Sequence, residues 1–248
     1  MRIFALSDLH LGLGVNKPMD RFGSVWHQHH EKIQKAVRAR LGADDWLLIP
    51  GDISWAINVE QARLDLQLIH ELPGKKLLLR GNHDYWWTSM SKVERFARAH
   101  ALTSLYFIDE HFKELSAEAS AQVAPWLVAG CRLWTNERDF EKAEDAKILE
   151  RELQKLERVT QRVRARLESG ENDPNRTVLM LHYPPFSRDC EQNRATDLIE
   201  ESGIKRVIYG HLHGHAGKES FEGVLRGVRY QMVAGDHVAF WPQRVDED

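Results

Sequence analysis

Carboxylates, histidines and one asparagine occur in five short polar stretches of this sequence, and each stretch directly follows an apolar run. The most compact is Gly81-Asn82-His83-Asp84, which follows the run Lys75–Arg80. The other four supply Asp8 and His10, Asp52, His182, and His211 with His213. Oxygen ligands mixed with imidazoles, without a thiolate, suit borderline divalent metals such as Mn, Fe, Co or Zn. The five stretches therefore predict a metal site.

The number of candidate ligands indicates two metal ions rather than one. Seven groups exceed the roughly four to six ligands of a single ion, but they fit two ions that share one bridging carboxylate. Two metals about 3.5–4 Å apart can hold a bridging hydroxide and stabilise both oxygens of an in-line phosphoryl displacement. The residue types alone thus point to a binuclear hydrolase.

An alternation of strands and helices would bring these stretches together. Strands are expected at 2–6, 46–49, 75–80, 177–181 and 206–209, and helices at about 24–41, 59–71, 89–100 and 197–201. The segment between Gly51 and Gly81 has the length of one right-handed βαβ unit. Since open α/β sheets bind ligands beyond the carboxyl ends of their strands, the polar stretches should meet at one edge. Less regular β-like segments follow at 105–108 and 126–134, and closing antiparallel strands are expected after residue 213.

A long charged segment lies at about 137–169. Its apolar residues recur every three to four positions, so we expect one helix, or two with a slight break. The row Arg158, Arg162 and Arg166 is like-charged at i, i+4 spacing, which costs helix stability. A solvated face is the simplest interpretation of this row, and an anionic ligand is the alternative. We expect this helical insertion to cover the site or to form a dimer contact.

The composition of the chain limits its expected partners, cellular location and number of domains. A formal charge of −3 gives no general attraction to nucleic acid. Two cysteines among 248 residues fit a reducing compartment, and no apolar stretch approaches the length of a membrane span. With no repeat and no low-complexity linker, residues 1–248 are expected to form a single cytoplasmic domain, whose oligomeric state the sequence leaves open.

The ordered motifs resemble those of a known family. Asp8-Leu-His10, Gly51-Asp52, Gly81-Asn-His-Asp84, His182 and Gly210-His-Leu-His213 are similar, in this order, to the motif set of the calcineurin-like metallophosphoesterase superfamily. The resemblance implies an α/β (α+β) fold, a four-layer α/β/β/α sandwich in which a mixed β-sandwich is flanked by helices. It also implies two divalent metal ions as cofactors, with Mn the first expectation and Fe, Zn or Co the alternatives.

The same resemblance implies a role for each site residue. One metal ion would be bound by Asp8, His10, Asp52 and His213. The second would be bound by Asp52, Asn82, His182 and His211, so that Asp52 bridges the two. His83 would be the catalytic residue that stabilises the phosphoryl oxygens or protonates the leaving group, and Asp84 would orient it.

Departures from the motif set narrow the choice within the superfamily. The residues after Gly51-Asp52 lack the arginine-containing extension of Ser/Thr protein phosphatases, and Trp55 stands where purple acid phosphatases carry a ligand tyrosine. What remains resembles the bacterial-type group of small phosphodiesterases, pyrophosphohydrolases and nucleases. We expect a phosphodiesterase or pyrophosphohydrolase with a small phosphorylated substrate. A phosphomonoesterase and a non-catalytic metal-binding interaction scaffold are the alternatives, but the complete ligand set and His83 favour an enzyme.

Substrate contacts are the least specified part of the prediction. Arg188, Tyr183 and Lys17 follow motif residues in loops and could contact substrate phosphate. Trp86 and Trp87 either pack against the following helix or form a stacking wall for a base or sugar. His27, His29 and His30 are expected on the surface of a helix.

Overall fold

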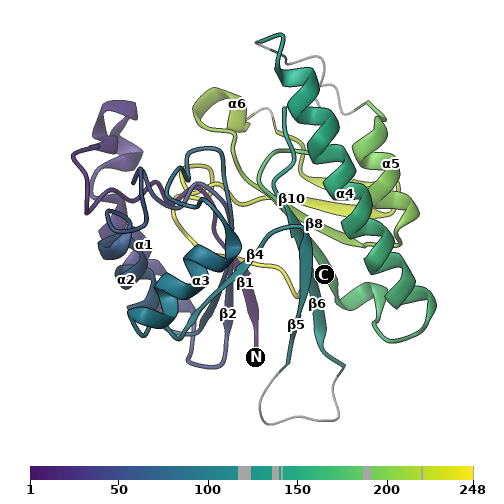
Figure 1. The fold of residues 1–248 in the computed structure, drawn as a ribbon, viewed down its shortest axis with the longest axis horizontal. Helices are drawn as coiled ribbons and strands as arrows, with labels where there is room; N and C mark the ends of the chain where they lie inside the picture. The colour runs from purple at the N-terminus through teal and green to yellow at the C-terminus, as the bar shows by residue number, and fades with distance from the viewer. Residues whose placement is uncertain (117–123, 136–139, 141, 187–190, 219, 248) are drawn as a thin grey trace.

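Two β-sheets pack face to face and carry helices on both outer faces. The computed structural model describes residues 1–116, 124–135, 140, 142–186, 191–218 and 220–247. The first sheet has the order β11-β1-β2-β3-β4, formed by Gln243–Arg244, Ile3–Ala5, Trp46–Pro50, Lys75–Leu79 and Leu105–Ile108. The second has the order β5-β6-β7-β8-β10-β9, formed by His111–Leu115, Trp126–Cys131, Thr177–Leu181, Arg206–Tyr209, Val228–Met232 and Gly223–Leu225. The predicted α/β sandwich is confirmed (Figure 1).

Each sheet is parallel at its centre, and antiparallel strands lie at both edges of the second sheet but at only one edge of the first. β1 to β4 run parallel, as do β6, β7, β8 and β10, whereas β11, β5 and β9 pair antiparallel. The prediction of closing antiparallel strands is confirmed for the β9–β10 pair and for β11, but β10 also lies parallel to β8. Strand β5 was not expected from the sequence.

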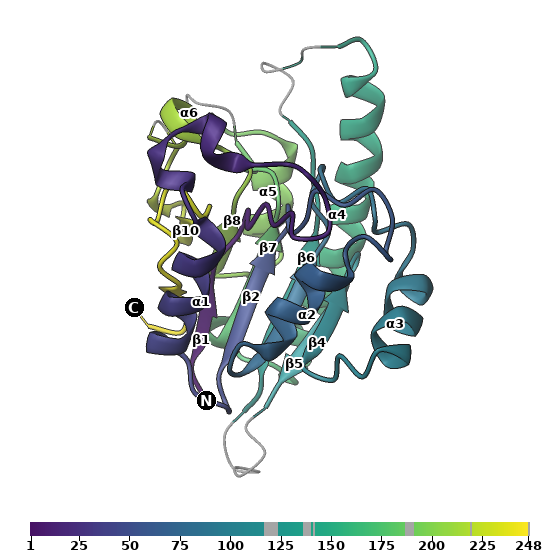
Figure 2. The same ribbon diagram turned by 90° about the vertical axis from the view of Figure 1, so that its left-hand side faces the viewer.

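The helices cover the two outer faces. α1 (His29–Arg40), α2 (Arg63–Glu71) and α3 (Met90–Ala99) lie on the first sheet, in front of it in Figure 2. α4 (Asp145–Glu168) and α5 (Arg194–Glu201) lie on the second sheet. The described part of the chain also contains the short helix α6 (Gly214–Lys218) and the 3₁₀ turns η1 (Met19–Phe22), η2 (Ser24–Trp26) and η4 (Pro174–Arg176).

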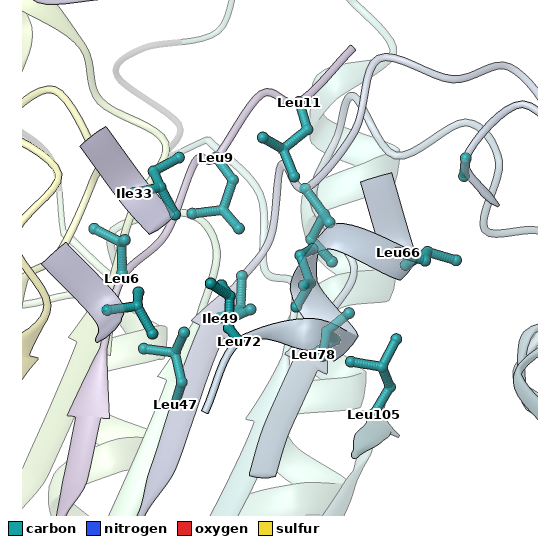
Figure 3. Close-up of a cluster of buried hydrophobic side chains, with 14 of the residues drawn as sticks. Leu6, Leu9, Leu11, Ile33, Leu47, Ile49, Leu66, Leu72, Leu78 and Leu105 are labelled. Atoms are coloured by element: carbon teal, nitrogen blue, oxygen red, sulfur yellow. The ribbon is translucent and has the colours of Figure 1, made fainter. Parts of the chain in front are cut away.

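Alternation along the strands divides the core into three layers. In β2, Leu47 and Ile49 face the helices of the first sheet, in the cluster that Figure 3 shows. Trp46 and Leu48 face the opposite way, into the layer between the two sheets. A third cluster fills the space between the second sheet and α4. The apolar layer between the sheets thus holds them face to face.

Four helices begin at residues other than those expected, among them α2, which begins at Arg63 rather than near residue 59. α1 begins at His29 rather than near residue 24, because Gln28 takes a left-handed backbone conformation (φ 48°) that interrupts the helix. α5 begins at Arg194 rather than Asp197, because the Asn193 side chain caps it by accepting hydrogen bonds from the Ala195 and Thr196 amides. α4 begins at Asp145 and is one continuous helix. Part of the predicted 137–169 insertion, at 137–139 and 141, lies outside the described residues.

The arginine row of α4 lies along the β4–β5 turn at the surface. Arg158 pairs with Glu110 at 2.7 Å, Arg162 donates to the Glu110 carbonyl at 3.2 Å, and Arg166 pairs with Glu114. Arg158 and Arg162 remain exposed, as the solvated-face interpretation predicts, and the contacts with Glu110 and Glu114 offset the repulsion of the like-charged row.

Candidate metal centre

The loops after five strands form one hydrogen-bonded platform. The Asp8 amide donates to the Gly51 carbonyl at 3.0 Å, and the His10 amide donates to the Asp52 carbonyl at 2.9 Å. The His211 amide donates to the Asp8 carboxylate at 3.0 Å, and the Gly210 amide donates to the His182 carbonyl at 3.1 Å. These main-chain bonds and the Asp8 carboxylate therefore fix the ends of β1, β2, β7 and β8 relative to one another.

The platform holds a strained backbone. Asp8, His10, Asp52 and His211 all have positive φ, at 56°, 42°, 50° and 73°, which is uncommon for residues other than glycine. Such conformations persist only where surrounding contacts fix them, and they cluster at functional sites. All four residues are candidate metal ligands, so the strained backbone conformations coincide with the candidate site.

Two motif glycines are required by close approach. A side chain at Gly81 would overlap Asp52, and one at Gly210 would overlap Asp8 and Ser7. The glycine that precedes each motif in the sequence thus allows an acidic residue to pack directly against the neighbouring main chain.

The structure brings all seven predicted ligand residues together in two clusters. In the first, the Nε2 atoms of His10 and His213 lie 3.2 Å apart, and Asp8 Oδ1 lies 3.4 Å from His213 Nε2. In the second, Asn82 Oδ1 lies 2.7 Å from His182 Nε2 and 3.0 Å from His211 Nδ1. One side-chain atom from each of Asp8, His10 and His213, and likewise of Asp52, His182 and His211, lies within 4.8 Å of the others.

The Asp52 carboxylate lies between the two clusters. Its Oδ2 is 3.7 Å from His10 Nε2, and its Oδ1 is 3.5 Å from His182 Nε2. One oxygen thus faces each cluster, which is the arrangement that a carboxylate bridging two cations requires.

The electrostatics of the centre depend on burial. Burial, with the nearby Asp8 and Asp84 carboxylates, raises the pKa of Asp52 well above its usual range. Burial lowers the pKa of His10 and of His211, and it lowers the pKa of His182 to about 4. These three imidazoles are therefore neutral at pH 7, the form in which histidine binds a metal.

His213 behaves in the opposite way. Burial lowers its pKa, but the hydrogen bonds to Asp236 and Asp8 outweigh burial and raise the pKa to about 10. The same contact, with the charge of His213, overcomes the burial of Asp8 and lowers the pKa of that carboxyl. A positive charge at the first cluster is therefore favoured, whether a proton or a metal ion supplies it.

Hydrogen-bond arithmetic tests whether a cation fits the second cluster. His182 Nδ1 lies 2.9 Å from the Pro50 carbonyl, and its Nε2 lies 2.7 Å from Asn82 Oδ1. A neutral imidazole carries one N–H, so it donates to only one of these acceptors. The lone pair of the other nitrogen then faces the lone pair of an oxygen, and the two repel each other. A divalent cation bound between these two atoms would remove that repulsion. Imidazole nitrogens with carboxylate and amide oxygens suit a borderline divalent metal.

The sequence reasoning missed one member of the centre, Asp236. Its Oδ1 accepts a hydrogen bond from His213 Nδ1 at 2.7 Å, and its Oδ2 accepts one from the Gly214 amide at 3.0 Å. A carboxylate on the far nitrogen of a histidine fixes its tautomer and orientation. The signal was present, because Gly235-Asp236 follows the apolar end of β10 just as Gly51-Asp52 follows β2.

Among the described residues, the Asp84 carboxylate makes its hydrogen bonds to groups other than the His83 ring, so its predicted role in orienting that ring stays a prediction without a supporting contact. Its Oδ1 accepts hydrogen bonds from the amides of Ile53 (2.9 Å) and Ser54 (3.1 Å) and from Trp86 Nε1 (2.9 Å). Its Oδ2 accepts one from the Gly81 amide at 2.8 Å. The carboxylate is fully buried and joins the loops after β2 and β3.

His83 is placed beside the bridging carboxylate. Its amide donates to Asp52 Oδ1 at 2.8 Å, and its Nε2 lies 4.0 Å from Asp52 Oδ2. The ring is about one-third exposed (35%), unlike that of His182, which is completely buried. Burial and the charge of His213 lower the pKa of His83.

Two of the predicted substrate contacts are buried. Trp86 is 1% exposed and packs in the core beside Trp87, so it has no face for a base or sugar. Tyr183 is 4% exposed, and its ring lies 3.8 Å from that of His211, so it supports a candidate ligand instead of contacting substrate. Lys17 is exposed near Trp55. Arg188 lies outside the described residues.

His29 also differs from expectation, since it is buried rather than on the surface. Its Nε2 lies 3.2 Å from the His10 carbonyl, and Trp26 packs edge-on against both His10 and His213. Trp26 and His29 therefore pack against the first cluster and support it.

Among the described residues, no helix has the length and apolar character that crossing a bilayer requires.

Comparisons with known proteins agree with this geometry. The chain is 26% identical over 283 residues to the acyl-carrier-protein phosphodiesterase PptH of Mycobacterium tuberculosis, an alignment that covers 98% of this chain and 80% of that protein. The crystal structure of TT1561 of Thermus thermophilus superposes with a TM-score of 0.52 at 14% identity, covering 99% of both chains. Residues 1–215 match the family model described as calcineurin-like phosphoesterase. The chain therefore belongs to the calcineurin-like phosphoesterase family and is a metal-dependent hydrolase of phosphoester bonds.

Proposed function

We propose that this protein is a binuclear phosphodiesterase that hydrolyses the phosphodiester or pyrophosphate bond of a small substrate. The observation that carries the proposal is the position of Asp52, with one oxygen facing each of two clusters of acceptor atoms. A single ion would be bound by one cluster only, and the second Asp52 oxygen and the second set of ligands would then have no metal to bind.

Each metal would be held by the residues of its own cluster and by Asp52. Asp8, His10 and His213 would hold one ion, and Asn82, His182 and His211 would hold the other. A bound pair of divalent cations supplies Lewis acidity at the phosphoryl oxygens and activates water at neutral pH. Mn²⁺ is the first choice, with Fe, Zn or Co as alternatives, because the ligands mix oxygen with imidazole nitrogen.

His83 would act on the substrate rather than on a metal. Its Nε2 faces the Asp52 side of the centre, and its ring is the partly exposed one. A neutral imidazole donating one hydrogen bond can stabilise a phosphoryl oxygen, and a protonated one can transfer a proton to the leaving oxygen.

The similarity to PptH, a phosphodiesterase that aligns with 98% of this chain, favours a diester substrate over a monoester. Its carrier-protein substrate is a specific possibility for this chain. The predicted cytoplasmic location, single domain and lack of a nucleic-acid footprint stay predictions.

A substrate panel with defined metal content tests the proposal. The protein is stripped of metal, reconstituted with Mn²⁺, and assayed with bis(p-nitrophenyl) phosphate, p-nitrophenyl phosphate, a nucleotide sugar and holo-acyl carrier protein. We expect two metal equivalents and a kcat/KM for the aryl diester at least ten-fold above that for the monoester. The reverse preference would make the protein a phosphomonoesterase.

Matched variants separate the centre from the rest of the surface. Asp52→Asn should lose metal and turnover together, whereas Asp20→Asn, at an exposed carboxylate, should retain both. A folded protein that binds no metal, or that binds two ions and hydrolyses none of these substrates, would refute the proposal and favour an interaction scaffold.

A further inference from the structure

The Trp55 indole packs against both His10 and His83. Its ring stacks on that of His10 with centroids 5.0 Å apart and planes 23° apart. It also lies 4.5 Å from the His83 ring at an angle of 45°. Trp55 is therefore in contact with one candidate metal ligand and with the candidate catalytic histidine.

Hydrogen bonds do not fix the His83 ring. Its Nδ1 is buried without a hydrogen-bond partner among the described residues, and its Nε2 is 4.0 Å from the nearest Asp52 oxygen, too long for a hydrogen bond. The oxygens of Asp84 are both occupied by other donors. The rotamer of His83 must therefore be set by packing.

The aromatic neighbours of His83 differ in their ability to supply that packing. Tyr85 lies 6.4 Å from the His83 ring and is 56% exposed, so it is free to move. The His10 ring lies 5.7 Å away and is directed at the metal cluster. Trp55 is nearer than either, and it presents a wide rigid surface.

Trp55 is itself held at three points. Its amide donates to the Leu11 carbonyl at 2.9 Å, which continues the pairing of the loops after β1 and β2. Its Nε1 lies 3.2 Å from Met19 Sδ, and the Lys17 ammonium lies 5.4 Å from the ring centroid. The indole is thus fixed on the platform that carries Asp8 and Asp52.

We propose that Trp55 is the positioning residue for His83, holding the imidazole toward the bridging carboxylate by ring packing in place of a hydrogen-bonded partner. The inference rests on the proposed function, because it assigns the means by which the catalytic side chain of that site is aimed. Without the indole, the His83 ring gains access to its other staggered rotamers, so the productive one is populated only part of the time. Misplacement of about 1 Å costs on the order of 100-fold in rate.

A double-mutant cycle in kcat tests this assignment. Trp55→Ala should lower kcat for an aryl diester by about 10–100-fold at saturating Mn²⁺, with KM changed less than about three-fold. In a His83→Ala background the same substitution should have no further effect, because its only target is gone. Trp55→Phe should recover most of the loss, and Tyr85→Ala should cause little.

The metal content of each variant is measured alongside, because Trp55 also touches His10. If Trp55→Ala loses metal at saturating Mn²⁺, or if the losses of Trp55→Ala and His83→Ala multiply in the double variant, the positioning role is wrong. If the wild-type protein binds two metals but turns over no phosphodiester, the proposed function fails instead.

A second readout needs neither metal nor substrate. In the metal-free protein, the His83 Hε1 resonance, assigned with His83→Ala, should carry a ring-current shift from Trp55 that is lost in Trp55→Ala and largely kept in Trp55→Phe. Retention of the wild-type chemical shift in Trp55→Ala would overturn the inference independently of catalysis.

Discussion

Replacing Asp84 by asparagine tests whether its carboxylate stabilises the fold or acts in catalysis. The four donors on Asp84 lie 2.8 to 3.1 Å away, three on Oδ1 and one on Oδ2. An asparagine carbonyl can keep the three bonds of Oδ1, but its NH₂ group then faces the Gly81 amide, and two donors oppose each other. The substitution is nearly isosteric, so packing changes little.

The cost follows from the kind of bond that is lost. A hydrogen bond to a charged group contributes about 1.5–3 kcal/mol, and the three retained bonds weaken when the acceptor becomes neutral. Burying a neutral amide costs less than burying a carboxylate, which offsets part of that loss. We expect the free energy of unfolding to fall by about 2–4 kcal/mol.

Urea unfolding of the metal-free protein, followed by circular dichroism, measures this change, and kcat is measured on the folded, Mn²⁺-loaded variant. We expect a lower unfolding midpoint and turnover within about five-fold of wild type, since the hydrogen bonds of the Asp84 carboxylate go to groups other than the His83 ring. Asp44→Asn, at an exposed aspartate, is the control. Unchanged stability with a large loss of kcat would show that Asp84 acts on the chemistry and would refute this reasoning.

Three further perturbations test other parts of the structure. Gly210→Ala should displace Asp8 and reduce bound metal to at most one equivalent by elemental analysis, whereas Gly12→Ala, whose added carbon meets only ordinary contacts, should keep both. Lys76→Met should lower the unfolding free energy by about 1–3 kcal/mol, because the buried ammonium donates to the His70, Leu72 and Gly74 carbonyls at the end of α2; an unchanged urea midpoint would contradict this. The pKa of His213 is raised from its ordinary value of 6.5 to about 10 in the metal-free fold, so its contribution to stability is fully present below pH 6.5 and is lost as the pH rises toward 10. The stability difference between wild type and His213→Gln should shrink over that range, and a difference that grows with pH would show that the sign is wrong.

The positions of the candidate ligands were predictable because they follow a local rule. An apolar strand that ends in glycine and a polar residue needs that residue at the sheet edge, and the same pattern recurs at Asp52, Asn82 and His211. Parallel pairing then brings the ends together regardless of the distance along the chain.

Roles set by side-chain direction were not predictable in the same way. The family resemblance implied that Asp84 orients His83, but its carboxylate accepts hydrogen bonds from the main chain of a different loop. Trp55 is remote from His83 in sequence and meets it because hydrogen bonds to the Asp52 and Asp84 carboxylates join the loops after β2 and β3. The start of α1 depends on the single left-handed residue Gln28, which the helical spacing does not reveal.

Anomalous diffraction from crystals of the Mn²⁺-loaded protein, recorded at the manganese absorption edge, tests the central claim most directly. We expect two peaks about 3.5–4 Å apart. One should lie among Asp8, His10 and His213, the other among Asn82, His182 and His211, with one Asp52 oxygen toward each. A single peak, or two peaks that do not share Asp52, would contradict the binuclear centre.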